Sequence, residues 1–426
     1  MILPHPLTEE QQRRSQHYAY GFNTFNGLSY ICVGDTILIL FGVQLGLPNW
    51  VIATLGALYY FGYLLLPLGK PIAARVGVAQ CQSICWLLRN TTAIVIASTA
   101  ILVHYGWHRT AIAILLCGAF TFYGFRAAGI VLATPFLAGY TPRDAVSRVL
   151  GLFTGCYYFA SLTALAAIYL LLGWRSSVEV LAGIMVVGAL FGITSTWFIR
   201  HIDEPAAIQQ SARKPLLPQL RAMLHSPVVL RQIAAVFLTS TAHILLFPMA
   251  MLTVKRGYGF SNHHALLFSI CHTLGACVMS FATAPVAGRI GPRNLLVIAY
   301  ALEIAVAFAL GHAPDHHSLA FMGTAFFVIG SNFICISNAL GNYFIRSIPQ
   351  EQHVVASIAV NCFSGAVAGL AGLAINSTLL HCFVPHNAIA EFRHLFLATA
   401  CILLPGLLFF LRMRPLPREK PVTPTG

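Results

Sequence analysis

Twelve long apolar segments constrain the fold of this 426-residue chain more than any other feature of its sequence. A helix that crosses the hydrocarbon core of a bilayer needs about 20 mainly apolar residues. The first six segments lie near residues 18–46, 50–69, 81–104, 110–138, 148–172 and 178–199. The second six lie near residues 228–255, 264–287, 294–312, 319–346, 353–381 and 391–412. The sequence therefore predicts an all-α integral membrane protein with twelve transmembrane helices.

The amino-acid composition agrees with a chain embedded in lipid. Hydrophobic residues make up 58% of the chain, charged residues make up 9%, and the mean hydropathy is +0.76. A soluble domain of this composition would expose a large apolar surface. The net charge of +13 would favour nucleic-acid binding in a soluble chain, but in a membrane protein Lys and Arg gather at the cytoplasmic helix ends. We therefore expect the lipid bilayer as a partner, and no nucleic acid.

The basic residues also predict the orientation of the chain. With the amino terminus inside, 18 of the 25 Lys and Arg residues fall in the tails and inward loops, 5 in outward loops and 2 within helices. Because basic residues are enriched on the cytoplasmic side, both termini are predicted to lie in the cytoplasm, for example beneath a bacterial inner membrane. Residues 200–226 are polar and contain three prolines, which indicates a linker between domains 1–199 and 227–426. We expect a monomer.

A short internal repeat indicates that these two domains are related. The stretch 70–77, KPIAARVG, returns as APVAGRIG at 284–291, an offset of 214 residues (284 minus 70). An offset of half the chain length is typical of a transporter built from two related halves. Each copy lies in a short basic gap between apolar segments, so both copies are predicted to lie on the same membrane face.

The repeated stretch resembles the loop signature of the major facilitator superfamily, usually written G-x-L-A-D-R-x-G-R-R. The matching residues are Arg75, Gly77, Arg289 and Gly291, while Ala74 and Gly288 stand where the signature has Asp. The resemblance implies two pseudo-symmetric six-helix bundles around a midplane site, with the first, fourth, seventh and tenth helices lining the cavity. It also implies that these arginines and glycines act in the conformational change.

Four charged residues fall inside the predicted helices, where a charge costs about 2.5–3.5 kcal/mol even on lenient scales. They are Asp35, Arg89, Arg126 and Glu303. The resemblance implies that Asp35 and Arg126 face each other beside the substrate path, as a proton-coupling ion pair. A small change in their separation can move a proton on or off the carboxyl group. Arg89 and Glu303 fall on helices that the family places at the periphery, where a transport role is less expected.

Uncharged polar residues supply the remaining candidates for a substrate cavity. Ser331, Asn338 and Asn342 follow one stripe of the tenth segment together with Cys335, and His243 lies in the seventh. The first segment carries Asn26 and Tyr30, but Asn26 and Asp35 are nine residues apart and lie on opposite faces of a straight helix. Either Asp35 or the face of Asn26 and Tyr30 is therefore turned toward neighbouring helices, unless the helix bends.

No motif for catalysis occurs in the sequence, which contains neither H-E-x-x-H, G-x-S-x-G nor a phosphate-binding G-x-x-x-x-G-K-[ST] loop. We expect no enzyme activity, no cofactor and no metal site, although His312, Asp315, His316 and His317 cluster in one outward loop. The prediction is a secondary active transporter of a small polar solute, coupled to protons or another ion. The alternatives are proton-driven efflux of amphipathic compounds, and a transporter-like scaffold or sensor.

Overall fold

The computed structural model describes residues 2–141, 146–213, 215–316, 318–348 and 353–413, and almost all of them are helical. The first part of the chain comprises α1 (Glu9–Val33), α2 (Asp35–Gln44), α3 (Asn49–Phe61), η1 (Gly62–Leu65), α4 (Leu66–Val76), α5 (Val78–Ala97), α6 (Thr99–His104), α7 (His108–Gly129), α8 (Ala133–Gly139), α9 (Val146–Trp174) and α10 (Val178–Arg200). The second part comprises α13 (Pro227–Leu252), η2 (Thr253–Gly257), α14 (Asn262–Ile290), α15 (Pro292–Gly311), α16 (Leu319–Ser347), α17 (His353–Ala359), η4 (Val360–Ser364), α18 (Gly365–Phe383) and α19 (Ile389–Arg412).

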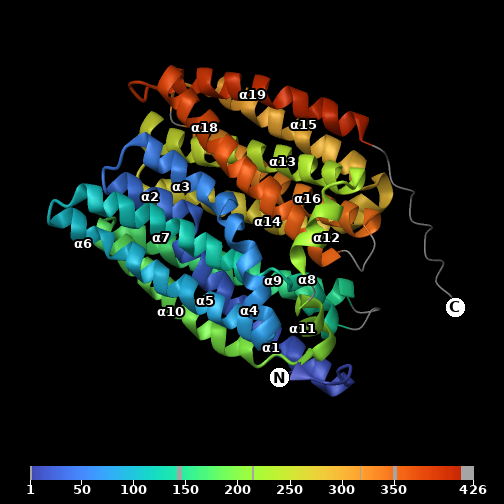
Figure 1. The fold of residues 1–426 in the computed structure, drawn as a ribbon. Helices are drawn as coiled ribbons and strands as arrows, with labels where there is room; N and C mark the ends of the chain where they lie inside the picture. The colour runs from blue at the N-terminus through green and yellow to red at the C-terminus, as the bar shows by residue number, and fades with distance from the viewer. Residues whose placement is uncertain (1, 142–145, 214, 317, 349–352, 414–426) are drawn as a thin grey trace.

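Eleven helical stretches within the described ranges are long and apolar enough to cross a membrane. The protein is therefore an integral membrane protein. The eleven do not include α14, which is 29 residues long and packs along α16 and α9. In Figure 1 the helices α1, α5, α7 and α10 lie below α13, α15, α18 and α19, whereas α2 and α3 lie at about the level of α16.

The first span is interrupted, which the sequence left open. Gly34 separates α1 from α2 with an extended backbone at ψ −177°, and its N–H donates to the carbonyl of Tyr30. Asp35 therefore begins a second helix rather than continuing the first. Interrupted membrane helices are tolerated where the freed backbone is buried in protein or lines a cavity. On a straight helix Asn26 and Tyr30 could not share a face with Asp35. Because the chain changes direction at Gly34, this restriction does not apply.

The two ends of the helical bundle differ in how the first and second parts of the chain meet. We call the end where α1 and α13 begin and α10 and α19 end the terminal end, and the opposite end the far end. One apolar core joins both parts toward the far end, for example Ile37 to Phe41 with Leu245 to Leu252. At the terminal end a separate core is built, apart from Ile358, from residues before 213. Within the described ranges, the large shared core thus lies toward the far end, while Ile358 and the contact of α4 with η4 join the two parts nearer the terminal end.

Hydrogen bonds between the two parts reinforce this far-end seal. The hydroxyl groups of Thr36 on α2 and Ser269 on α14 lie 2.6 Å apart and share a buried hydrogen bond. Arg256 donates to the carbonyl of Leu47 at 2.5 Å and to the side chain of Asn49. Nδ1 of His263 donates to the carbonyl of Tyr169 at 2.8 Å. Each of these bonds would have to break for the far end to open.

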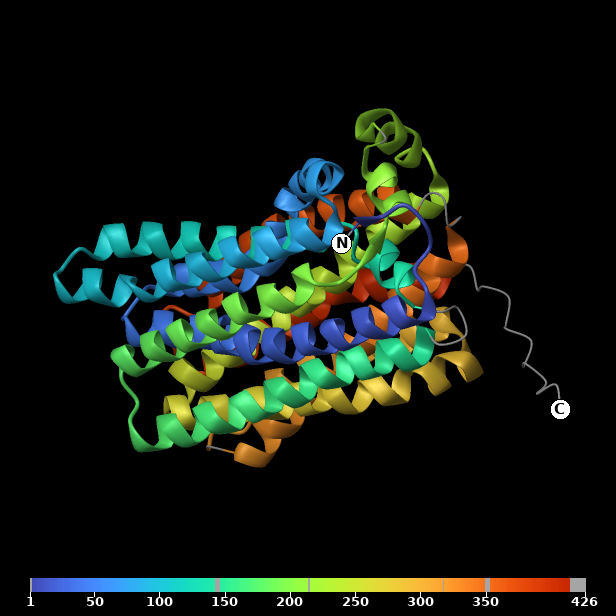
Figure 2. The ribbon, with the colours of Figure 1, turned by 90° about the horizontal axis from the view of Figure 1, so that it is seen from below.

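The connection between the two parts is folded onto the terminal end rather than extended. It contains β2 (Glu204–Pro205), α11 (Ala206–Arg213) and α12 (Leu216–Met223). β2 pairs in parallel with β1 (Ile2–Leu3), while α11 packs on α4 and α12 packs on α17. Figure 2 shows these short helices beside the end where α1 begins. Arg14 also forms a 2.5 Å ion pair with Asp203, which ties α1 to the connection.

Candidate functional site

Two adjoining cavities lie between the first and second parts of the chain. The terminal-end cavity has a volume of about 320 Å³ and extends along α13 from Gln232 to His243. The central cavity has a volume of about 250 Å³ and reaches Thr36 and Ser269 at the far-end seal. Ligand pockets usually measure about 300–1,000 Å³, so the terminal-end cavity lies at the lower end of this range and the central cavity just below it, which limits a solute to a small size.

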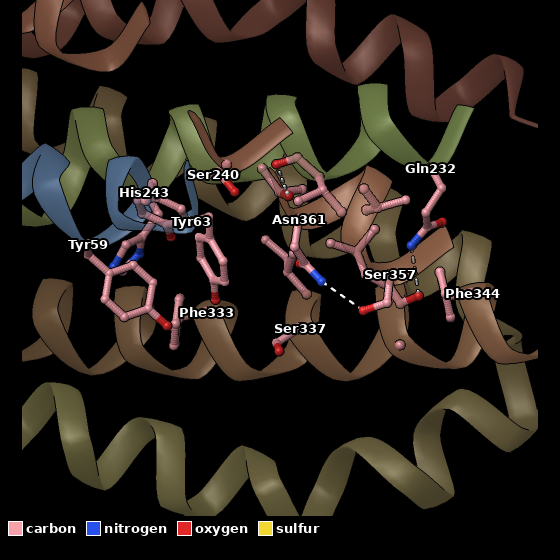
Figure 3. A pocket seen from close by; sticks show the side chains of 18 of the residues that line it. Tyr59, Tyr63, Gln232, Ser240, His243, Phe333, Ser337, Phe344, Ser357 and Asn361 are labelled. Carbon is pink, nitrogen blue, oxygen red and sulfur yellow. Dashed lines mark hydrogen bonds between the residues drawn. The ribbon is translucent and has the colours of Figure 1, made fainter. Parts of the chain in front are cut away.

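Four rings stand between the two cavities and line both of them, namely Tyr59, Tyr60, His243 and Phe333. Tyr59 and Tyr60 contact each other edge-on at 4.9 Å, and His243 lies 4.6 Å from Phe333. Figure 3 shows Tyr59, His243 and Phe333 close together at one end of the terminal-end cavity. A solute passing from one cavity to the other must move past these rings.

Arg126 carries a positive charge into the central cavity. Its guanidinium donates to the Tyr59 hydroxyl at 3.0 Å and lies 4.6 Å from the centre of that ring. It also lies 5.7 Å from the centre of the Tyr30 ring. Tyr30 lines the same cavity, as the sequence predicted. The side chain of Asp35 lies outside the described residues, but its neighbours Gly34 and Thr36 line the cavity with Arg126, so the pairing of Asp35 with Arg126 stays a prediction.

Asn26 does not reach either cavity, contrary to the prediction. Its side-chain oxygen accepts hydrogen bonds from Nε1 of Trp86 at 2.9 Å and from Arg89 at 3.0 Å. Arg89 is fully buried, donates also to Ser29 at 3.2 Å and Asn90 at 3.3 Å, and lies over the Trp86 ring. Because an uncompensated charge in lipid is costly, these neutral acceptors must solvate Arg89. Asn26 therefore joins α1 to α5 instead of contacting solute.

The cavity-lining face of α16 is also displaced from the predicted stripe. Phe333, Ser337 and Gly341 line the terminal-end cavity at a spacing of four residues, together with Ile336, Leu340 and Phe344. Ser331 and Asn338 line neither cavity, and the side chain of Asn342 is outside the described residues. Ser331 lies instead against Gly275 of α14. At about 100° per residue, the residues that line the cavity lie about 160° around α16 from the predicted stripe, which is nearly the opposite face.

Polar side chains on several helices complete the cavity walls. His243, which was predicted, has no hydrogen-bond partner for its buried Nδ1 among the described residues, and His272 of α14 lies 6.1 Å away, ring to ring. In the terminal-end cavity, Asn361 donates to Ser357 at 3.1 Å (Figure 3). His272, Ser357 and Asn361 were missed, because each is a lone polar residue in an apolar segment and no spacing singles it out.

Glu303 lies at a cavity, although the sequence placed it at the periphery. Only 1% of its surface is exposed and it lines the terminal-end cavity. Its Oε2 atom is buried and has no hydrogen-bond partner within the described part of the chain. Among the described groups of the neighbouring helices, His243 lines the same cavity and Tyr300 lies one turn earlier on α15. A buried carboxyl group without a cation is most stable with its proton bound.

The two copies of the internal repeat share an unusual backbone conformation. Gly77 has φ +90° and ψ 167°, Gly291 has φ +83° and ψ 152°, and each directly precedes a membrane helix, α5 or α15. Side chains rarely tolerate this region, which explains a glycine in both copies. The side chain of Arg75 is exposed at the terminal end, and that of Arg289 lies outside the described residues. The functions of Arg75 and Arg289 therefore stay predictions.

An acidic residue from the connection contacts the first copy of the repeat. Both carboxylate oxygens of Glu204 accept from the backbone N–H of Val78, at 2.9 and 2.8 Å, at the start of α5. Gln209 donates to the carbonyl of Arg75 and Arg213 to that of Ala74. Burial raises the pKa of Glu204 above its ordinary value near 4.5, and the backbone N–H groups of Val78 and Ala79 oppose this rise. The first copy has Ala74 where the signature has Asp, and Glu204 brings a carboxylate to the same loop.

We expect Glu204→Ala to lower the free energy of unfolding by about 1–3 kcal/mol, because a buried N–H group loses its acceptor. Glu204→Gln keeps one acceptor oxygen and should cost less. The folded state raises the pKa of Glu204, so the folded state holds the Glu204 proton more tightly than the unfolded chain does. The stability of the parent protein should therefore fall as the pH rises from about 4.5 toward the raised pKa of Glu204. Thermal unfolding of the three proteins across this pH range measures both effects. A Glu204→Ala variant as stable as Glu204→Gln would contradict the assignment.

These features define a polytopic helical membrane protein with cavities between its first and second parts. Residues 19–373 match the sequence profile of the Major Facilitator Superfamily. The chain belongs to this superfamily, as the resemblance of the repeated loop predicted. No curated protein sequence matches the chain.

Solved transporter structures share this fold at low sequence identity. A mutant of the nucleoside transporter NupG aligns with a TM-score of 0.70 and 12% identity, covering 93% of this chain and 99% of that one. NupG itself aligns with a TM-score of 0.67 and 12% identity, covering 95% and 100%. The proton:xylose symporter XylE, bound to 6-bromo-6-deoxy-D-glucose, aligns with a TM-score of 0.64 and 13% identity, covering 94% and 97%. The likeness establishes the fold, and the family makes the protein a secondary transporter.

Proposed function

We propose that this protein moves a small polar solute across the membrane by alternating access, driven by a proton gradient. The observation that carries the proposal is the pair of cavities between two parts whose hydrogen bonds to each other, among the described residues, gather at the far end. An ordinary packed interface would not leave solute-sized space lined by Gln232, Ser240, His243 and Arg126 in the middle of a membrane protein. In this arrangement the solute reaches the site from the terminal end.

The proposal includes the complete architecture. α14 would be the twelfth span, because its 29 residues can cross a bilayer and it packs lengthwise on α16. Domains 1–199 and 227–426 would then be six-helix bundles that rock about the cavities, joined by residues 200–226. A monomer with both termini in the cytoplasm of a bacterial inner membrane fits this arrangement. Labelling of a single cysteine at position 210 from the cytoplasmic side alone would test the orientation.

Proton coupling is proposed to reside in Asp35 and Arg126, with Glu303 as the alternative carboxyl group. Asp35 is the acidic residue in the helices that the family uses to line its cavity, and Arg126 is placed in the central cavity. Glu303 has the burial and cavity contact expected of a second proton site. The Asp35 pair is preferred because Arg126 supplies the counter-charge that a switchable carboxyl group needs.

Efflux of amphipathic compounds is the second candidate function, favoured by one specific observation. Tyr30, Tyr59, Tyr60, Tyr157 and Tyr158 all line the central cavity, so its walls are rich in aromatic surface. These rings also carry hydroxyl groups, however, and Arg126 lies among them. This mixture suits a polar solute with a planar body better than a purely apolar drug.

Counterflow in proteoliposomes tests transport directly. Vesicles with purified protein are loaded with an unlabelled solute and diluted into a trace of the same labelled solute. A carrier produces transient labelled accumulation without any gradient of protons, and protein-free vesicles do not. Testing nucleosides, xylose, organic acids and an amphipathic dye separates the two candidate functions. Accumulation of none of these compounds would instead support the scaffold reading.

A further inference from the structure

The charges buried in the first part of the chain do not balance. Three charged residues lie deep within its membrane-spanning stretches, namely Asp35, Arg89 and Arg126, and a fourth, Lys70, is buried in α4. Arginine stays protonated in proteins, so two guanidinium charges face at most one carboxylate. This excess of at least one positive charge holds wherever the Asp35 side chain lies. It becomes larger whenever Asp35 binds a proton.

The two arginines act on the same region. Arg89 bonds to Asn26 and Ser29 of α1, and Arg126 lies against Tyr30, the next residue along that helix. Arg89 is sealed behind α1 by neutral acceptors, whereas Arg126 lines the central cavity. The positive potential of both charges is therefore accessible to a solute only at Arg126.

The other described side chains of the central cavity supply no negative charge. They are aromatic, hydroxyl-bearing, apolar or imidazole groups, and no acidic side chain occurs among them. Tyr59 accepts from one of the five N–H groups of Arg126, and a carboxylate can take two at once. Glu303 lies in the other cavity, which meets this one at the rings of Tyr59, Tyr60, His243 and Phe333.

We infer that the solute is a small organic anion, a carboxylate on a planar body, whose charged group binds Arg126 and whose body lies among the tyrosine rings of the central cavity. This inference rests on the proposed transport function and adds the substrate class. Asp35 can balance the charge of one of the two arginines. One monovalent anion bound in this way balances the charge of the other. The faces and hydroxyl groups of Tyr30 and Tyr157, 6.5 Å apart ring to ring, suit a flat polar molecule.

Pairs of compounds with equal shape and unequal charge provide the test. Benzoate is compared with benzamide, and nicotinate with nicotinamide, by thermal unfolding and calorimetry of the purified full-length protein at pH 7.5. We expect both acids to bind about ten- to a hundredfold more tightly than their amides, the range for a charge-assisted bond. Arg126→Gln should remove the preference and Arg126→Lys should keep part of it. Arg109→Gln, at the exposed start of the same helix, should leave it unchanged.

Equal binding of acids and amides, or binding of neither, would overturn the anion assignment. So would a preference for acids that survives in Arg126→Gln. If that variant does not fold, the comparison of acid with amide in the parent protein still decides the question. Counterflow of nucleosides or xylose in the same preparation distinguishes a wrong substrate class from a protein that does not transport.

Discussion

The variant that combines Thr36→Cys with Ser269→Cys is expected to lose transport on oxidation and to recover it on reduction. The two native hydroxyl oxygens lie 2.6 Å apart across the far-end seal, so thiol groups at these positions can reach disulfide geometry with little backbone movement. If the far end must open during each cycle, the covalent bond should remove about nine-tenths or more of the uptake rate. Uptake by proteoliposomes before and after addition of a reductant measures the effect.

The double variant and its controls are made in a protein whose 11 native cysteines are replaced. Each single variant, Thr36→Cys or Ser269→Cys, removes the native hydrogen bond without closing a bond in its place. Both singles should transport and be insensitive to oxidant. If the oxidised double variant, shown by mass spectrometry to be cross-linked, transports at the parent rate, then the far end does not open and rocking of the two parts is wrong.

How much the sequence predicts is clearest in the positions of its glycines. The repeat at 70–77 and 284–291 predicted related structure, and Gly77 and Gly291 do share one positive-φ conformation before a membrane helix. Apolar segments and repeats are set by the bilayer and by local backbone sterics, which a single sequence records. The break at Gly34 was not predicted, because no proline marks it and an isolated glycine is common in membrane helices.

The orientation of polar side chains could not be predicted with the same success. Asn26 and Ser331 are both polar residues in apolar helices, yet Asn26 solvates Arg89 and Ser331 packs on Gly275. Asn and Ser serve equally well as interhelical hydrogen-bonding groups and as solute ligands, so residue type does not separate the two roles. Only the rotation of each helix against its neighbours does so. On α16 the cavity face, with Ser337, lies about 160° around the helix from the predicted stripe, with Asn338.

Glu204 illustrates a compensation that a linear motif hides. The loop signature has an acidic residue where this chain has Ala74, which made the first copy look degenerate. The structure brings Glu204, 130 residues later (204 minus 74), to the N–H of Val78 beside the same loop. A carboxylate at a helix N-terminus is favourable wherever in the chain it originates. Degeneracy of the local motif was therefore a poor guide to whether the loop is held in place.

Asp35→Asn is expected to abolish proton-driven accumulation while leaving exchange of solute partly intact. Asparagine keeps the shape of the side chain and cannot take up a proton, so the solute gradient loses its link to the proton gradient. In vesicles with an imposed pH gradient, the ratio of internal to external solute should fall to about 1, the value for uncoupled equilibration. Counterflow, which needs no proton gradient, should persist. The matched control is Glu303→Gln, which removes the other carboxyl group buried at a cavity.

The two variants separate three arrangements of the coupling site. If Asp35 alone couples, Glu303→Gln retains accumulation with the parent pH dependence. If Glu303 couples instead, the results are exchanged, and the proton enters through the terminal-end cavity that Glu303 lines. If each variant halves the number of protons moved per solute, both groups titrate during the cycle. Arg126→Ala should weaken binding more than Asp35→Asn does, because it removes the cation that lines the central cavity and leaves the carboxylate without its predicted partner. Accumulation by Asp35→Asn at the parent level would exclude Asp35 and leave Glu303 as the proton site.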